Sequence, residues 1–183
     1  MKTSYKLGIF HQLLFTVLIS INLSTTANAQ AVKVSSPNGK ITVIISDEGS
    51  PNYTINFNNK SVITTSKLGM AFKSAPSFGD DFKISTTEKN TNNSQWEQPW
   101  GERKTITDHH NEAVITFKHA RKIANKFTVR FRVFNDGVGF RYEVIKQSGL
   151  DTVEIIDEFT EFTVENSNKA TAWWIPARGW NRY

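Results

Sequence analysis

The densest group of titratable side chains in this sequence runs from Asp108 to Glu112 and contains His109 and His110. On a β-strand, successive side chains point to opposite faces, so His110 and Glu112 would share one face while His109 points away. A zinc site needs three or four ligands, so at least one more would have to come from elsewhere in the fold. The competing interpretation is a turn that leads into a strand at Glu112.

Hydrolytic chemistry has few candidates. Glycosidases use two acids about 5–10 Å apart in a pocket. Glu97 and Glu102 are near each other in sequence, which does not place them in a cleft. The sequence has no cysteine and no Gly-x-Ser-x-Gly motif, so neither nucleophile is supported. An epimerase would need a histidine acid and a glutamate base in one cleft, and its histidine candidates, by residue type alone, are His109, His110 and His119.

Two tryptophans follow a polar, Asn-rich run within residues 86–103. Trp96 and Trp100 lie beside Pro99 and Gly101, which favours a loop. Loops on a rigid β scaffold are frequent binding sites, which makes both indole rings candidate binding groups. The alternative is that they only cap the edge of a sheet.

The elements that must position these residues are short strands. Runs rich in β-branched residues alternate with turn signals, and no window shows a convincing period of 3.6 residues. The sequence therefore predicts an all-β fold, an antiparallel sandwich or barrel. The expected strands cover residues 32–35, 40–46, 53–57, 61–65, 68–73, 81–85, 112–119, 152–157 and 158–165, together with a hairpin over 127–145.

That hairpin is the clearest element. Two alternating runs flank Asp136-Gly137, a pair that suits a two-residue type I′ turn. The resulting register places Val133 opposite Phe140 on an apolar face. On the other face, Arg130 lies opposite Glu143 and Arg132 opposite Arg141. Because like charges oppose each other there, we expect this face to meet acidic groups.

The N-terminus has the features of a secretory signal peptide. Lys2 and Lys6 precede an apolar run over residues 13–23, and 27–29 (Ala-Asn-Ala) fits a cleavage site. We therefore expect residues 1–29 to be removed and the product to be periplasmic or secreted, with no membrane anchor. Cleavage reduces the formal net charge of +5 by two. The remaining excess is small and scattered, which argues against a nucleic-acid partner.

The C-terminal run, residues 171–183, is strongly aromatic. A domain that ended there would leave its indole rings uncovered, so we expect the intact polypeptide to continue. Six segments also resemble, in order, the N-terminal part of glycoside hydrolase family 97. They are Trp96–Glu102, Asn111–Glu112, Phe134–Tyr142, Glu161–Thr163, Ala172–Pro176 and Asn181–Tyr183.

The resemblance implies an exported α-glucosidase or α-galactosidase. It implies a β-super-sandwich of the galactose-mutarotase-like type, incomplete over residues 30–183, followed in family members by a catalytic (β/α)8 barrel. It further implies a calcium ion in the intact enzyme, with any ligand from the sandwich just beyond Tyr183, and no cofactor or metal ligand within this chain. The residues expected at the sugar-pocket rim are Trp173, Trp174, Trp180, Asn181 and Arg182, with Trp96 and Trp100 as further carbohydrate contacts.

Two functions therefore remain open. The first is a non-catalytic sandwich that packs on the barrel of an exported glycoside hydrolase, inactive by itself. The second is a free-standing carbohydrate-binding or surface-interaction module.

Overall fold

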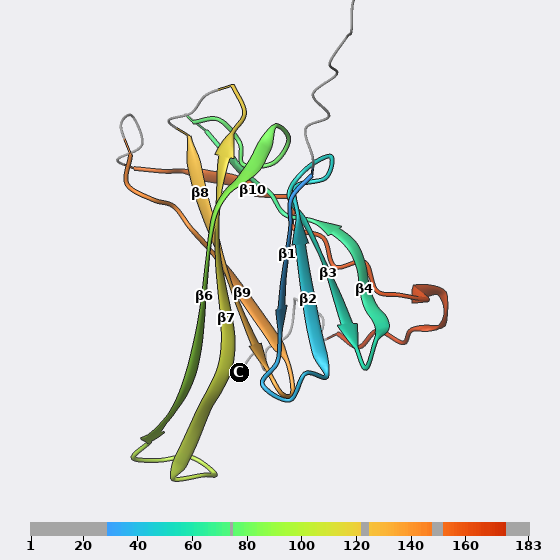
Figure 1. Ribbon diagram of the computed structural model, residues 1–183, viewed down its shortest axis with the longest axis vertical. Helices are drawn as coiled ribbons and strands as arrows, with labels where there is room; N and C mark the ends of the chain where they lie inside the picture. Colours follow the sequence, from blue (N-terminus) through green and yellow to red (C-terminus); the bar gives the residue numbers. More distant parts are fainter. Residues whose placement is uncertain (1–28, 74, 122–124, 148–151, 175–183) are drawn as a thin grey trace, which may run out of the picture.

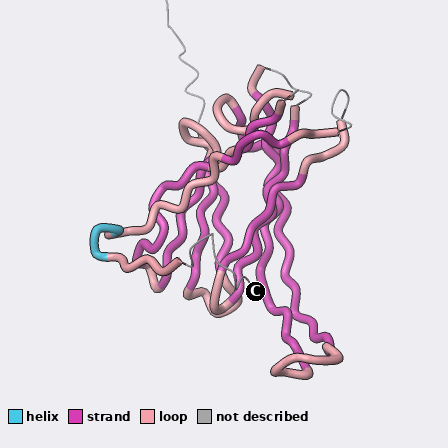
Figure 2. Tube along the Cα trace, turned by 180° about the vertical axis from the view of Figure 1, so that it is seen from behind, coloured by secondary structure: helices cyan, strands magenta, loops and turns pink. Residues whose placement is uncertain are grey.

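The computed structural model of the protein contains two antiparallel four-stranded sheets packed face to face, together with a separate two-stranded sheet (Figure 1). It describes residues 29–73, 75–121, 125–147 and 152–174. Strands dominate it, with one short helical turn among the described residues (Figure 2). The prediction of an all-β antiparallel sandwich is confirmed. The elements are β1 (Ala31–Ser35), β2 (Ile41–Ser46), β3 (Asn52–Phe57), β4 (Lys60–Lys67), β5 (Met70–Phe72), β6 (Phe82–Glu97), β7 (Thr105–His119), β8 (Lys126–Phe134), β9 (Val138–Glu143), β10 (Ile155–Glu158) and the 3-10 helix η1 (Ser167–Lys169).

The first sheet is a meander in the order β1-β2-β3-β4. Alternation in β2 buries Val43 and Ile45 while their neighbours on the strand are partly exposed. The turn into β4 uses Asn58 and Asn59 at φ 48° and 62°. Two successive positive φ angles are typical of a type I′ turn, and asparagine tolerates them well. The turn that the sequence predicted at this point is therefore confirmed.

The second sheet has the order β6-β7-β8-β9 and contains a long two-stranded extension. The expected loop within residues 86–103 is shorter than predicted, because β6 continues to Glu97 and pairs with β7 along its length. The expected turn before Glu112 is wrong for the same reason. Residues 98–104, which include Trp100, form the turn between the two strands. Polar side chains bond across this ladder, for example Thr91 Oγ1 to Asn111 Oδ1 (2.8 Å). Polar residues on both faces hide the period-2 signal by which a strand is normally recognised.

The β8–β9 hairpin keeps the expected faces but not the expected register. Val133 pairs with Val138, a shift of two residues from the expected partner. Phe134 N donates a hydrogen bond to Gly137 O (2.8 Å), so the turn is centred on Asn135 and Asp136, one residue before the predicted pair Asp136-Gly137. Because side chains alternate with a period of two, a shift of two leaves every residue on its expected face.

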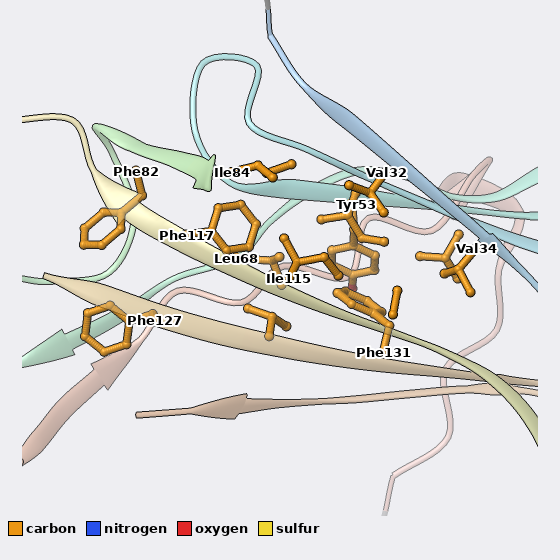
Figure 3. Close-up of a cluster of buried hydrophobic side chains, with 14 of the residues drawn as sticks. Val32, Val34, Tyr53, Leu68, Phe82, Ile84, Ile115, Phe117, Phe127 and Phe131 are labelled. Carbon is orange, nitrogen blue, oxygen red and sulfur yellow. The ribbon is translucent and has the colours of Figure 1, made fainter. Parts of the chain in front are cut away.

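Aromatic rings fill the space between the sheets. Tyr53 of the first sheet packs against Phe131 of the second, with ring centroids 5.8 Å apart. Its hydroxyl donates to Glu161 O (2.8 Å), and burial raises the pKa of Tyr53 to about 12. Figure 3 shows these rings pointing toward one another from both sheets. Alternation in facing strands thus produces one continuous core.

After β9 the chain forms β10, which pairs with β5 in a separate two-stranded sheet. Residues 161–165 then run along β4, where Glu161 N donates to Lys67 O (3.0 Å) and Thr64 N donates to Thr163 O (2.9 Å). Phe162 reaches back to Phe140 of β9, with ring centroids 5.9 Å apart. The expected strand at 152–157 is thus shorter than predicted, and 158–165 is mainly an irregular edge segment.

The predicted signal peptide lies almost entirely outside the described residues, which begin at Ala29. Within the described part of the chain, the structure has no helix long and apolar enough to cross a membrane.

Candidate functional site

The exposed tryptophans of the described chain form two pairs. At the end of the β6–β7 hairpin, Trp96 and Trp100 are 52% and 84% exposed. Near the C-terminal end of the described residues, Trp173 and Trp174 are 90% and 79% exposed. Trp180, Asn181 and Arg182 lie outside the described residues. The structure thus presents four indole rings to solvent although it buries most of its other large aromatic side chains.

A compact turn carries Trp100. Gln98 N donates to Lys104 O (3.0 Å), and Gln98 Nε2 donates to Arg103 O (2.7 Å). Gly101 has φ 133°, a backbone conformation that strains any residue with a side chain, and a Cβ there would also displace the amide end of Gln98. In Figures 1 and 2 this tip extends beyond the sandwich, on the opposite side from the short helix η1. No contact between the two tryptophan pairs occurs among the described residues.

The acids near the tip do not form a catalytic pair. Glu97 is exposed and forms an ion pair with Lys104 Nζ at 3.3 Å. Glu102 is exposed in the turn. Neither lines one of the hollows described below, so nothing here holds two carboxylates in a pocket.

Charged residues gather instead on the outer face of the second sheet. Arg130 donates through Nη1 to Glu112 Oε1 (2.6 Å) and through Nε to Glu143 Oε1 (2.7 Å). Arg132 Nε donates to Glu112 Oε2 (2.9 Å), and Arg141 Nε donates to Glu143 Oε1 (2.9 Å). We call these five residues the arginine cluster. The sequence did not predict this cluster as a whole, although the expected contact of Arg130 with Glu143 is present.

The cluster holds both of its carboxylates in the ionised form. Hydrogen bonds from Arg130 lower the pKa of Glu143 to about 2, against the effect of burial, and Arg141 adds to the shift. Burial works to raise the pKa of Glu112, but the hydrogen bonds and charges of Arg132 and Arg130 outweigh it and lower that pKa. The like-charge pair is Arg130 with Arg141, not Arg132 with Arg141 as expected. The acidic groups that this face requires thus come partly from the chain itself.

Asp108 and His110 continue the same face of β7. A hydrogen bond of 2.5 Å joins His110 Nδ1 to Asp108 Oδ1 and lowers the pKa of Asp108. His110 is buried and packs against Phe134 with ring centroids 4.9 Å apart. Among the described residues, no group of three or more histidine, aspartate or glutamate side chains is placed to hold a metal ion. The pair is therefore a structural contact of the sheet.

Three hollows lie on different parts of the described surface. One, of about 470 Å³, lies between the β4–β5 junction, residues 77–80 and the edge segment, and includes Phe159 and Glu161. The second, of about 210 Å³, lies over β8 and β9 beside the arginine cluster. The third, of about 290 Å³, lies between β1, β6 and β7 and includes Lys33, Lys89 and Glu112.

A family model and a set of solved structures name the same family. The family model described as "Glycosyl-hydrolase 97 N-terminal" matches residues 34–183. A glycoside hydrolase family 97 enzyme from Pseudoalteromonas sp., solved in complexes with panose and with acarbose, is 53% identical with a TM-score of 0.77. The match covers 82% of this chain and 23% of that chain.

Two further relatives are more distant. A retaining alpha-galactosidase from Bacteroides thetaiotaomicron is 24% identical over 130 residues, which is 71% of this chain and 18% of that protein. A β-arabinopyranosidase structure shares the fold, with a TM-score of 0.69 at 23% identity over 74% of this chain and 22% of that one. This chain therefore spans less than a quarter of the length of these proteins.

Proposed function

The chain belongs to the glycosyl-hydrolase 97 N-terminal family, and on that basis we propose that it is the non-catalytic sandwich portion of an exported glycoside hydrolase. In the intact enzyme it packs against the catalytic (β/α)8 barrel and contributes to the rim of the sugar pocket. The observation that supports this proposal is the exposure of Trp173 and Trp174 on a sandwich that buries an aromatic core between its sheets. Exposed apolar groups of this size favour a partner surface.

The rim residues suit sugars by their chemistry. Indole rings such as those of Trp173 and Trp174 stack on the apolar faces of sugar rings. The guanidinium of Arg182 can make two directed hydrogen bonds to hydroxyl or carboxylate oxygens, and Asn181 offers both a donor and an acceptor. These residues, with Trp180, form the part of the rim that this chain supplies.

We propose α-linked glucosides or galactosides as the substrates of the intact enzyme. The relative at 53% identity was solved with panose, an oligosaccharide of α-linked glucose, and with acarbose. The retaining alpha-galactosidase is more distant, at 24% identity. The higher identity favours glucosides.

A turnover assay tests the non-catalytic role. Purified residues 30–183 are expected to release no p-nitrophenol from the α-glucoside or the α-galactoside. Turnover that survives removal of contaminating enzymes would overturn the proposal. Mass spectrometry of the mature protein tests export, with cleavage expected after Ala29.

Calcium, which the family resemblance implies for the intact enzyme, needs several oxygen ligands. The described residues bring no three carboxylates or histidines together. These described residues do not fit such a site.

A free-standing carbohydrate-binding module is the second candidate. The exposure of Trp96 and Trp100 on a glycine-dependent turn favours it, because exposed aromatic rings on a rigid scaffold bind sugar faces. This candidate predicts that residues 30–183 alone bind glycans and that Trp96→Ala or Trp100→Ala weakens the binding. Binding that neither substitution affects would exclude this mode.

A further inference from the structure

We propose that the outer face of β8 and β9 is the surface that docks on the catalytic part of the intact enzyme, with a carboxylate side chain of that part entering the hollow between Arg132 and Arg141. The inference rests on the proposed function and goes further by naming the docking face and the chemistry of its partner.

The hollow is lined by cationic groups without a carboxylate. It measures about 210 Å³ and is bounded by Arg130, Arg132, Phe134, Gly139, Phe140 and Arg141. Gly139 pairs with Arg132 across the sheet, and a Cβ added to it would meet no atom within 4 Å. The space over Gly139 is therefore open to a side chain from outside.

Hydrogen-bonding capacity on this face is unbalanced in favour of donors. Each carboxylate oxygen of Glu112 and Glu143 already accepts at least one bond from an arginine. Arg132 uses only its Nε, and its two terminal nitrogens form no hydrogen bond to any other described residue. Arg141 likewise has one terminal nitrogen without a partner in the described chain. The unmet requirement is for acceptors, and an additional carboxylate would supply two.

The donors are held in place before any partner arrives. Glu112 is 6% exposed although it lies on the outer face. Its carboxylate accepts a hydrogen bond from Arg132 Nε and so orients the Arg132 guanidinium. Arg130 joins both carboxylates and so ties β7, β8 and β9 together. A guanidinium that is already oriented loses less conformational entropy on binding a carboxylate, which favours docking.

The same face continues to the tip of the β6–β7 hairpin. Asn90 pairs with Glu112, Asn92 with His110 and Trp96 with Ile106, so these residues share the face of the arginine cluster. Trp96 is half-exposed there. A two-stranded ribbon is marginal in water unless a surface covers it. One extended partner would therefore contact both the hollow and the ribbon.

The test uses a chimera in which residues 34–183 replace the matching region of the Pseudoalteromonas enzyme, with a protease site inserted after Tyr183. The catalytic part of that enzyme is the probe. After cleavage, the dissociation constant of the two halves is measured at low and high salt. The variants are R132Q, R141Q and the double substitution, and Arg121→Gln is the matched control, since Arg121 is an exposed arginine near the far end of the same sheet.

We expect the double variant to weaken association by roughly ten- to a hundredfold, the range for a lost hydrogen-bonded charged contact. Its salt dependence should also decrease, and R121Q should leave both quantities unchanged. Arg130 is kept because it holds Glu112 and Glu143. R141Q leaves the hydrogen bonds of Glu112 intact, so this variant is expected to fold normally. Resistance of residues 30–183 to trypsin checks that the variant is folded.

The outcomes separate the two claims. Halves that associate equally well with and without Arg132 and Arg141 overturn the docking face while the proposed function stands. Halves of the unsubstituted chimera that separate at once contradict the proposed packing itself.

Discussion

The interior of the sandwich and its exposed rim contain the same kinds of residue in opposite environments. Phe131 and Tyr53 are fully buried between two sheets, whereas Trp100 and Trp173 are among the most exposed side chains of the described chain. The difference is whether a facing strand exists. Phe131 packs against Tyr53 of the opposite sheet and Phe140 of its own sheet. Within the described residues, no strand covers the rings of Trp100 and Trp173.

This contrast assigns different roles to the aromatic residues. Rings that alternate along paired strands bury apolar surface and stabilise the fold. The exposed rings of Trp100 at the hairpin turn and of Trp173 and Trp174 after η1 are expected to contribute little to stability, and exposed groups of this kind suit a partner surface. The arginine cluster is intermediate, because its carboxylates are buried or partly buried while its guanidinium groups reach solvent. The predictions below test this division.

Phe131→Ala should have the largest effect on stability. The ring lies 5.0 Å from Phe140 and 5.8 Å from Tyr53, so its loss leaves a cavity in the centre of the core. We expect the free energy of unfolding to fall by about 4 kcal/mol, measured by urea denaturation of residues 30–183. A loss below about 1 kcal/mol would mean that the sheets are not packed through this ring.

Glu112→Gln should have the next largest effect. The substitution removes the charge that Arg130 and Arg132 share, at 2.6 Å and 2.9 Å. Because both arginines are partly exposed, solvent screens part of the loss, and we expect about 2 kcal/mol. Glu97→Gln is the matched control, since Glu97 is an exposed acid paired with Lys104. Equal effects of the two substitutions would contradict the buried role of Glu112.

Acid should destabilise the protein through Glu143. The pKa of Glu143 is about 2 in the fold, against 4.5 ordinarily, so the unfolded chain takes up a proton first as the pH falls. The stabilising contribution is therefore complete above about pH 4.5 and is lost as the pH falls to about 2. After allowance for screening we expect a loss of about 1 kcal/mol. Urea midpoints at pH 6, 4 and 2.5 measure it.

The E143Q variant is the control for this titration. Its stability should fall less steeply over the same range, with the remaining slope coming from Asp108 and Glu112, whose pKa values are also lowered. Identical slopes in the two proteins would exclude Glu143 as a contributor.

Trp100→Ala should have the smallest effect on stability. The ring is 84% exposed, and substitutions of such surface residues usually change stability by less than about 0.5 kcal/mol. The unfolding midpoint should therefore match that of the unsubstituted chain. A loss near that of Phe131→Ala would place Trp100 in the core and remove the contrast between the two regions.

The sequence predicted the fold class because burial leaves a period-2 pattern in strands such as β2 and β8. It did not predict the outer half of β6, where Asn90 to Ser94 are polar on both faces and only cross-strand pairing defines the strand. The hairpin register was missed by two residues because the turn is centred on Asn135 and Asp136, one residue before the predicted pair. The turn found is supported by a bond from Asn38 N to Asn135 Oδ1, which involves a distant part of the chain.

The candidate site was predictable only in part. Residue type alone identified the tryptophans as candidate binding groups, and the described ones are exposed, as a binding role requires. The arginine cluster depends on Glu112, an acid that the sequence places at the end of a histidine-rich run and the fold places beneath two arginines. Such contacts between strands cannot be predicted until the pairing of the strands is known.

Hydroxyl-radical labelling with mass spectrometry tests most directly whether the exposed rim serves the rest of an enzyme. The oxidation rates of Trp173 and Trp174 are compared between residues 30–183 alone and the uncleaved chimera with the Pseudoalteromonas catalytic part. The account predicts rapid oxidation in the isolated chain and at least severalfold slower oxidation in the chimera. Equal rates in the two proteins would contradict it.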